Sequence, residues 1–152
     1  MTFYYFNPVQ SVYGAGALSS LPELLAGRRA ALVTFPEARA IGLLGRLESV
    51  LGDGLACVID NVMPNPDVAE LAATYERFWR GHPEVEAIVA VGGGSAIDTA
   101  KALAVADDGA CFADLVAGLA GERRFVPTRA RMLIAVPTTA GTGSEVTPWA
   151  TI

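Results

Sequence analysis

The strongest constraint on the fold of this chain is a run of three glycines between an apolar segment and a helical pattern. The apolar segment at 87–91 has the length of a strand, glycines 92–94 follow it, and residues 95–105 have helical spacing. Glycine lacks a β-carbon, so this turn lets an anion approach the backbone closely. The following helix would direct free N–H groups and its positive dipole end at that anion. The sequence therefore predicts a phosphate-binding turn.

The turn does not match the common phosphate motifs. A G-x-G-x-x-G fingerprint needs glycine where Ile97 stands, and a nucleophile elbow needs glycine at the same position. A Walker A loop needs Gly-Lys-Ser/Thr where Asp98-Thr99 stands. A second interpretation therefore stays open, in which the glycines only form a tight turn while Ser95 and Asp98 form a capping pair. In either case Lys101 is expected to pair with Asp98 on the helix surface.

Apolar segments of strand length alternate with helical patterns along the rest of the chain. Strands are expected at 30–35, 56–60, 87–91 and 132–136. Helices are expected near 18–25 and at 38–51, 67–80 and 95–105. The apolar faces of the second and third helices are expected at Ile41, Leu44, Leu47, Val50 or Leu51, and at Val68, Leu71, Tyr75, Phe78 and Trp79. Asn65 is expected to cap the helix at 67–80, with Pro66 in its first turn.

Strands that are apolar throughout are buried on both faces, and the helices between them supply the crossovers that parallel pairing needs. The chain is therefore predicted to form one α/β domain, residues 1–152, with a doubly wound, mostly parallel, Rossmann-like sheet. Two short extended segments, 3–6 and 11–13, could pair as an edge hairpin. Ligands bind beyond the carboxyl ends of such strands, where both the glycine turn and the loop at 137–147 are expected.

The loop at 137–147 carries hydroxyl side chains at five of its eleven positions, with two glycines among them. Hydroxyl groups both donate and accept hydrogen bonds, which suits the ribose and base edges of a nucleotide. Clusters of Ser, Thr and Gly are also ordinary loop composition. This loop is therefore a candidate site only in combination with the glycine turn.

Charge and composition exclude several classes of partner. A net charge of −5 and a pI of 4.8 disfavour nucleic acid, which requires clustered Lys and Arg. The nearest cluster, Arg123, Arg124, Arg129 and Arg131, is interpreted as a solvated loop and strand entry. The sequence shows neither the pattern of a secretory leader nor an apolar stretch of ~18 residues. We therefore expect a cytoplasmic location and no membrane partner.

The metal-ligating and thiol side chains are few. His82 is the single histidine, so a His-based metal site cannot be assembled from this chain, and the residue is expected to cap a helix end. Cys57 and Cys111 have no metal-ligand spacing and are expected to be buried thiols in a reducing compartment.

Two segments together resemble the iron-containing (group III) alcohol dehydrogenase family: Gly92-Gly-Gly-Ser-Ala-Ile-Asp-Thr-Ala-Lys101 and Pro137-Thr-Thr-Ala-Gly-Thr-Gly-Ser-Glu-Val-Thr147. Residues 7–16 and 63–66 are similar to its amino-terminal half as well. The resemblance implies a dehydroquinate synthase-like cofactor domain, followed by a helical domain whose Asp and three His bind Fe²⁺ or Zn²⁺. That domain is absent from this sequence, so the chain is expected to be an amino-terminal fragment that is inactive alone and belongs to a homo-oligomeric parent enzyme.

The resemblance also implies roles for particular residues. Gly93, Gly94 and Ser95 would face the pyrophosphate of NAD or NADP, and Asp98 would lie near the nicotinamide and its ribose. The remaining implied cofactor contacts are Thr138, Thr139, Thr142 and Asn65. The parent enzyme would transfer a hydride between the nicotinamide and a small alcohol or aldehyde, while the metal polarises the substrate oxygen.

One segment departs from the family pattern. Many members have an Asp after the first core strand, where its carboxylate can bind the ribose of NAD, whereas this chain has Thr34-Phe35-Pro36-Glu37. Without that carboxylate, repulsion of a 2′-phosphate is weaker, so use of NADP or of both cofactors is expected. Two alternative functions stay open: a dehydroquinate synthase-like or polyol-phosphate dehydrogenase domain, and a non-catalytic nucleotide-binding module.

Overall fold

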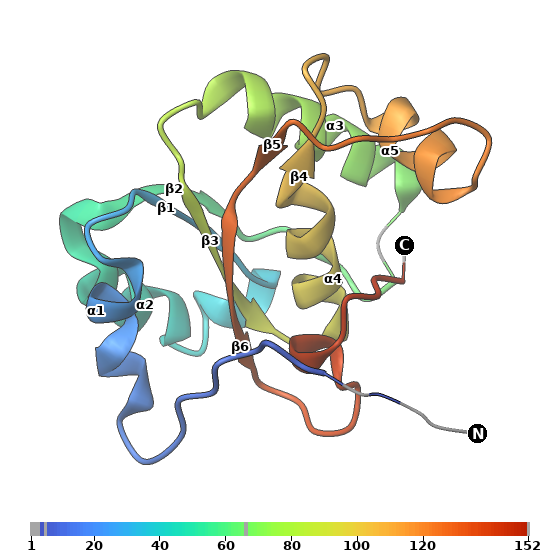
Figure 1. The fold of residues 1–152 in the computed structure, drawn as a ribbon. Helices are drawn as coiled ribbons and strands as arrows, with labels where there is room; N and C mark the ends of the chain where they lie inside the picture. The colour runs from blue at the N-terminus through green and yellow to red at the C-terminus, as the bar shows by residue number, and fades with distance from the viewer. Residues whose placement is uncertain (1–3, 5, 66, 152) are drawn as a thin grey trace.

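The computed structural model describes residues 4, 6–65 and 67–151. Four parallel strands form the central sheet in the order β2-β1-β3-β6 (Figure 1). Their bounds are Ala30–Val33 for β1, Leu55–Ile59 for β2, Ala87–Gly92 for β3 and Met132–Pro137 for β6. The doubly wound parallel sheet predicted from the sequence is therefore confirmed.

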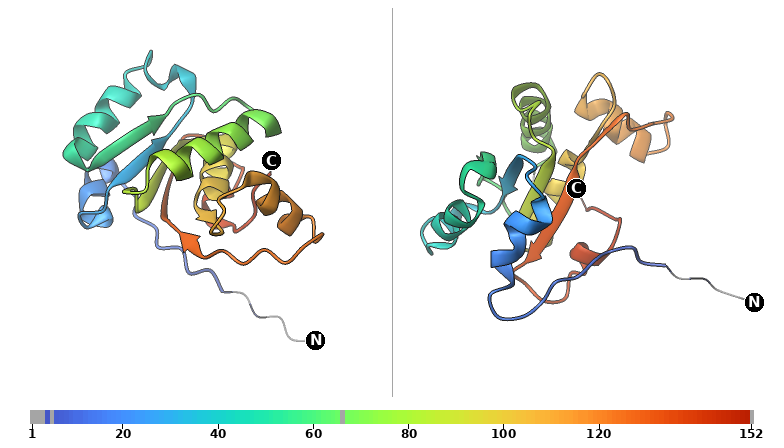
Figure 2. Two further views of the ribbon diagram at one scale, coloured as in Figure 1. Left: turned by 90° about the horizontal axis from the view of Figure 1, so that it is seen from above. Right: turned by 60° about the vertical axis from the view of Figure 1, so that its left-hand side comes forward.

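Helices cover both faces of this sheet, as the two views in Figure 2 show. One face packs against α1 (Leu21–Leu25) and α2 (Leu43–Leu51), and the other packs against α3 (Val68–Gly81) and α4 (Gly94–Leu103). Each face has its own hydrophobic cluster, and every residue of β1 and β3 is buried. Because the two central strands are apolar throughout, both of their faces can be covered.

The remaining elements are short. A two-stranded antiparallel sheet pairs β4 (Val105–Ala106) with β5 (Arg129–Ala130), and α5 spans Phe112–Leu119 between them. Within the described part of the chain, 3₁₀ helices lie at Ala17–Ser20, Pro36–Ala38, Gly52–Gly54 and Ser144–Val146.

The structure corrects the expectation that all four arginines near β5 are solvated. The guanidinium carbon of Arg131 lies 4.2 Å from the ring centroid of Trp79, and Arg131 also donates a hydrogen bond to the carbonyl of His82 at 3.1 Å. Burial lowers the pKa of this half-buried guanidinium from its ordinary value. Arg129 stacks on the same tryptophan at 5.0 Å, which joins β5 to the end of α3 by cation–π contacts.

Two predicted segments near the start of the chain differ from the structure. None of the described residues between 4 and 13 belongs to a strand, so the edge hairpin is wrong there, while residues 1–3 and 5 lie outside the described part. The helix expected at 38–51 begins at Leu43, because Gly42 adopts a left-handed φ of +75° directly before it. Ile41 lies before that break and is 65% exposed rather than buried.

The start of α3 also differs from the prediction. Asp67 caps this helix, since its carboxylate accepts hydrogen bonds from the N–H groups of Ala69 at 2.8 Å and Glu70 at 3.3 Å. Asn65 has a φ of +52° and is not the cap, Val68 is 51% exposed, and Pro66 lies outside the described residues. A carboxylate near a helix N-terminus also interacts favourably with the helix dipole, which explains why Asp is used here.

The expectations for His82 and for the two cysteines as free thiols agree with the structure, and the last predicted helix differs only in where it ends. The N–H of His82 donates to the carbonyl of Phe78 at the end of α3, as expected of a capping position. Cys57 and Cys111 are free, half-buried thiols, and burial raises the pKa of Cys57 to about 11. The α4 helix ends at Leu103, two residues earlier than predicted, because Val105 pairs in β4.

Candidate functional site

Strand register brings the glycine turn and the hydroxyl loop to the same edge of the sheet. Gly92 at the end of β3 pairs with Pro137 at the end of β6, and the N–H of Thr138 donates to the carbonyl of Gly92 at 2.9 Å. Because the two strands are parallel, both loops begin at the same level, beyond the carboxyl ends. The candidate site is therefore built where the topology of an α/β sheet favours ligand binding.

Gly92 is a position that only glycine fits. Its φ is +158°, and a β-carbon built there would lie 2.7 Å from the β-carbon of Ala96 and 3.3 Å from the ring of Phe35. A contact below 3.0 Å cannot be relieved without moving α4, since Ala96 is buried against the core. The glycine is thus needed for the sharp passage from strand to helix, before any ligand is considered.

Gly93 and Gly94 serve a different purpose, because they let the two loops touch. A β-carbon at Gly93 would lie 3.2 Å from the Oγ1 of Thr139, and one at Gly94 would lie 3.2 Å from the Cγ2 of Thr142. The exposed threonines of the hydroxyl loop therefore lie directly against the N-terminus of α4. The structure brings these four predicted residues together, as the sequence interpretation required.

The capping alternative is not observed. Gly93 is the N-cap of α4 and the helix has no side-chain capping hydrogen bond. The Oγ of Ser95 instead accepts a hydrogen bond from the N–H of Asn65 at 3.3 Å, which joins the segment after β2 to the glycine turn. Asn65 and Ser95 are thus neighbours on the same edge as the two loops.

Asp98 lies deeper than the other predicted residues. It is 7% exposed, one carboxylate oxygen lies 3.3 Å from the Nζ of Lys101, and the other accepts a hydrogen bond from the N–H of Thr151 at 3.0 Å. The predicted pairing with Lys101 is confirmed, but the expected place on the helix surface is wrong, because the two side chains are only 10% and 12% exposed. Lys101 also donates to the carbonyl of Trp149, so the two charged side chains fasten the segment at 149–151 across α4.

The segment after β1 presents no carboxylate at the strand end. Thr34 is fully buried and its hydroxyl donates to the carbonyl of Val91 at 2.8 Å, while Phe35 packs beside Gly92. Glu37 lies further on, within a 3₁₀ helix. The exposed Arg39 that follows lies 3.6 Å from Glu48 and 4.0 Å from Asp60. Asp60, which directly follows β2 and whose side chain is 43% exposed, is therefore the acid that Arg39 faces at this edge.

Ser144 also belongs to the site, although it was not among the residues predicted from the sequence. This serine is 8% exposed, and its Oγ would lie 3.3 Å from a β-carbon on Gly94. It follows Gly143, which has a left-handed φ of +66° and directs the loop back towards α4. The spacing of hydroxyl residues in the loop was visible in the sequence, but the turn that buries this one was not.

The described residues were also compared with the requirements of a metal site and of a membrane-spanning helix. They contain no group of three or more His, Cys, Asp or Glu side chains arranged to hold a metal ion. Among their helices, none has the length and apolar character that crossing a bilayer requires.

Comparison with known proteins agrees with this geometry. The family model for iron-containing alcohol dehydrogenase matches residues 8–152. Alcohol dehydrogenase 4 of Saccharomyces cerevisiae (strain YJM789) is 35% identical over 153 residues, which cover 97% of this chain and 38% of that protein. The 4-hydroxybutyrate dehydrogenase of Cupriavidus necator is 35% identical over 147 residues, which cover 94% of this chain and 37% of that protein. This chain therefore belongs to the iron-containing alcohol dehydrogenase family.

A solved structure supports the same assignment. The crystal structure of sulfoacetaldehyde reductase from Bifidobacterium kashiwanohense in complex with NAD⁺ superposes with a TM-score of 0.81 at 34% identity. The match covers 97% of this chain and 39% of that one. The present chain thus spans about two fifths of the length of the relatives it matches.

Proposed function

We propose that this chain is the dinucleotide-binding part of a metal-dependent oxidoreductase, which transfers a hydride between a nicotinamide cofactor and a small alcohol or aldehyde. The observation that carries the proposal is the close contact of the glycine turn with the hydroxyl loop at the carboxyl edge of the sheet. Relatives that are named as dehydrogenases, and a similar reductase solved with NAD⁺, support it.

The proposed binding of the pyrophosphate depends on the backbone. The N–H groups of Gly93, Gly94 and Ser95 lie at the N-terminus of the ten-residue helix α4, where the helix dipole favours an anion. A side chain at either glycine would fill the space next to the hydroxyl loop. This region therefore fits a diphosphate that approaches the main chain closely.

The side chains proposed to contact the rest of the cofactor surround that turn. Thr138, Thr139 and Thr142 would offer hydroxyl groups to the nucleotide, and Asn65 would border the turn through its contact with Ser95. Asp98 is proposed to lie near the nicotinamide and its ribose. Both of its carboxylate oxygens already have partners within the chain.

The hydride chemistry belongs to the cofactor, and a bound Fe²⁺ or Zn²⁺ would supply Lewis-acid polarisation of the substrate oxygen. We infer that residues 1–152 form one domain, and that the metal ligands come from a helical region of the same protein outside this sequence. On this proposal the chain alone binds cofactor without turning over substrate. The parent enzyme is proposed to be a cytoplasmic homo-oligomer.

The segment after β1 bears on the choice of cofactor. Thr34 is buried and hydrogen-bonded, and Phe35 packs against Gly92, so neither supplies a carboxylate to repel a 2′-phosphate. Arg39 nearby carries a positive charge and is exposed. We therefore propose that the protein accepts NADP as well as NAD.

Calorimetric titration with NAD⁺ and NADP⁺ tests these proposals in the whole protein, with Gly94→Ala as the variant. The added β-carbon would lie 3.2 Å from Thr142 and would stand where the diphosphate approaches. The expected result is a loss of at least about tenfold in affinity for both nucleotides, equivalent to about 1.4 kcal/mol.

Gly45→Ala is the matched control, because Gly45 is an exposed residue of α2 and a β-carbon there meets nothing within 4 Å. It should bind both nucleotides as the wild type does. Equal affinity in the Gly94 and Gly45 variants would refute the proposed diphosphate site. Binding of NAD⁺ without any binding of NADP⁺ would refute only the dual use of cofactors.

A further inference from the structure

The segment after β1 lies opposite the glycine turn at a switch point of the sheet. The connection after β1 leads to α2 on one face, whereas the connection after β3 leads to α4 on the other face. Since β1 and β3 are neighbours, these two connections diverge from adjacent strand ends. Ligands of doubly wound sheets bind at such a point. The segment that begins at Phe35, whose ring packs beside Gly92, therefore borders the proposed cofactor site.

Arg39 carries the positive charge of this segment. It directly follows the 3₁₀ helix Pro36–Ala38, and its side chain is 65% exposed. Its Nη2 lies 3.6 Å from the carboxylate of Glu48 and 4.0 Å from that of Asp60. Both distances exceed the range of a hydrogen bond. The two carboxylates thus attract the guanidinium without forming a hydrogen bond to any of its N–H donors, which remain available to a ligand.

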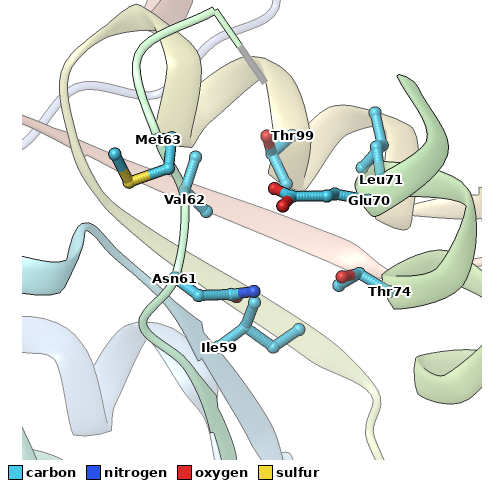
Figure 3. Close-up of a pocket in the computed structure, with 8 residues that line it drawn as sticks. All are labelled: Ile59, Asn61, Val62, Met63, Glu70, Leu71, Thr74 and Thr99. Atoms are coloured by element: carbon cyan, nitrogen blue, oxygen red, sulfur yellow. The ribbon is translucent and has the colours of Figure 1, made fainter. Parts of the chain in front are cut away.

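Asp60 places this charge cluster, Arg39, Glu48 and Asp60, at the end of β2. It directly follows that strand, and Figure 3 shows that the side chain of the next residue, Asn61, extends towards Thr74 of α3. Asp60 instead faces Arg39, which also lies near Glu48 of α2 on the other side of the sheet. Successive side chains of an extended segment point to opposite faces, which explains the difference. Because β1 lies between β2 and β3, the cluster and the glycine turn lie on opposite sides of the β1 end.

The proposed function decides which part of the dinucleotide reaches this cluster. The nicotinamide is proposed to lie near Asp98, which bonds to Thr151 in the segment that follows β6. The adenosine half would then extend the other way from the glycine turn, past the end of β1. Neighbouring strands are about 4.8 Å apart, so the end of β2 lies roughly 10 Å from that of β3. The ribose of the adenosine and its 2′ substituent can span that separation from the diphosphate.

We propose that Arg39 determines cofactor specificity by binding the 2′-phosphate of NADP, and that Asp60 and Glu48 limit its affinity; this inference rests on the proposed function. A guanidinium can bind two phosphate oxygens through parallel N–H bonds. The two carboxylates repel the same phosphate. With NAD, which has a hydroxyl at this place, the carboxylate of Asp60 can accept a hydrogen bond. The balance of these three charges would therefore set the preference between NAD and NADP.

Arg39→Met tests the attractive part of the cluster by calorimetric titration of the whole protein with NADP⁺ and NAD⁺. The variant removes the cation and keeps most of the length of the side chain. Affinity for NADP⁺ is expected to fall by at least about tenfold, because a charge-assisted pair of hydrogen bonds is lost. Affinity for NAD⁺, which has no group for Arg39 to bind, should change by less than about twofold.

Asp60→Asn tests the opposing part. This substitution removes one negative charge near the phosphate and keeps the size of the side chain. Affinity for NADP⁺ is therefore expected to rise by about threefold or more, while affinity for NAD⁺ stays the same or falls. A rise for both nucleotides alike would contradict a contact with the 2′ position.

Arg46→Met is the matched control, because Arg46 is an exposed residue of α2 and the variant makes the same change in net charge. Its ratio of NADP⁺ to NAD⁺ affinity should equal that of the wild type. The inference is overturned if Arg39→Met keeps this ratio or weakens both nucleotides equally, and in either case the diphosphate site stands. Wild-type protein that binds neither nucleotide would instead reject the diphosphate site, and the role of Arg39 with it.

Discussion

The three glycines of the turn are required for different physical reasons. Gly92 is needed because of a clash within the chain, whereas Gly93 and Gly94 are needed because another loop lies within van der Waals distance. Substitution at Gly92 is therefore expected to disturb the fold. Substitution at the other two glycines is expected to disturb the contact between loops, which is why Gly94 is the better probe of binding.

The ion pair of α4 leads to a prediction at the same scale. Asp98 and Lys101 have side chains that are 10% and 12% exposed, so their attraction is little screened by solvent. Lys101→Met removes the cation and leaves a nearly buried carboxylate with the N–H of Thr151 as its other partner. We expect a loss of about 2 to 3 kcal/mol in the free energy of unfolding, measured by urea denaturation.

Arg39→Met is the matched control for that measurement. Arg39 is 65% exposed and its partners Glu48 and Asp60 lie 3.6 and 4.0 Å away. Exposed pairs of this kind contribute about 0 to 1 kcal/mol, so the control should change the free energy of unfolding by less than about 1 kcal/mol. A Lys101 variant as stable as the Arg39 variant would show that the pair does not fasten the segment at 149–151.

At the scale of elements, a hydroxyl hydrogen bond joins α3 to the small sheet, in addition to the cation–π contacts of Trp79. The phenol of Tyr75 donates a hydrogen bond to the carbonyl of Val105 in β4 at 2.8 Å, and the ring packs edge-on against Phe112 of α5. Burial raises the pKa of Tyr75 to about 12 from an ordinary value of 10, with Asp107 adding to the effect. The neutral phenol is therefore part of the packing between α3 and the small sheet.

This shift predicts how stability changes in alkaline solution. A group whose pKa is higher in the folded state stabilises the fold below its unfolded value, and that contribution disappears as pH rises to the folded value. The wild type should therefore be more stable than Tyr75→Phe at pH 9, and the difference in Tm should shrink between about pH 10 and pH 12.

Tyr13→Phe serves as the control for the alkaline experiment, since Tyr13 is 92% exposed. Its Tm should follow that of the wild type throughout. A difference between wild type and Tyr75→Phe that stays constant from pH 9 to pH 12 would argue against the neutral, hydrogen-bonded phenol.

At the scale of the whole molecule, the proposed anion site is local while the net charge is −5. The site depends on main-chain N–H groups at one helix end, not on a basic surface. The protein is therefore predicted to pass through a heparin column at pH 7.5 and about 0.1 M salt, because extended polyanions need many Lys and Arg contacts. Retention that is reversed by salt would contradict this prediction.

The central elements were predictable because their apolar patterns are local and unambiguous. The strand at Ala87–Gly92 and the helix after it follow from one continuous run of sequence, and the same applies to Leu71, Tyr75 and Phe78 on the buried face of α3. The start of α3 was not predictable in detail, since Asn65 and Asp67 are both good capping residues and only the path of the chain selected Asp67.

The sequence by itself determined the parallel sheet, the place of the glycine turn at a strand end, and the resemblance that the family match confirmed. These depend on the residue order along one segment at a time. Only the tertiary structure decided that Thr139 and Thr142 touch Gly93 and Gly94, and that Asp98 faces the N–H of Thr151. The physical reason is that such contacts are set by strand register and helix packing, which bring together residues about fifty positions apart.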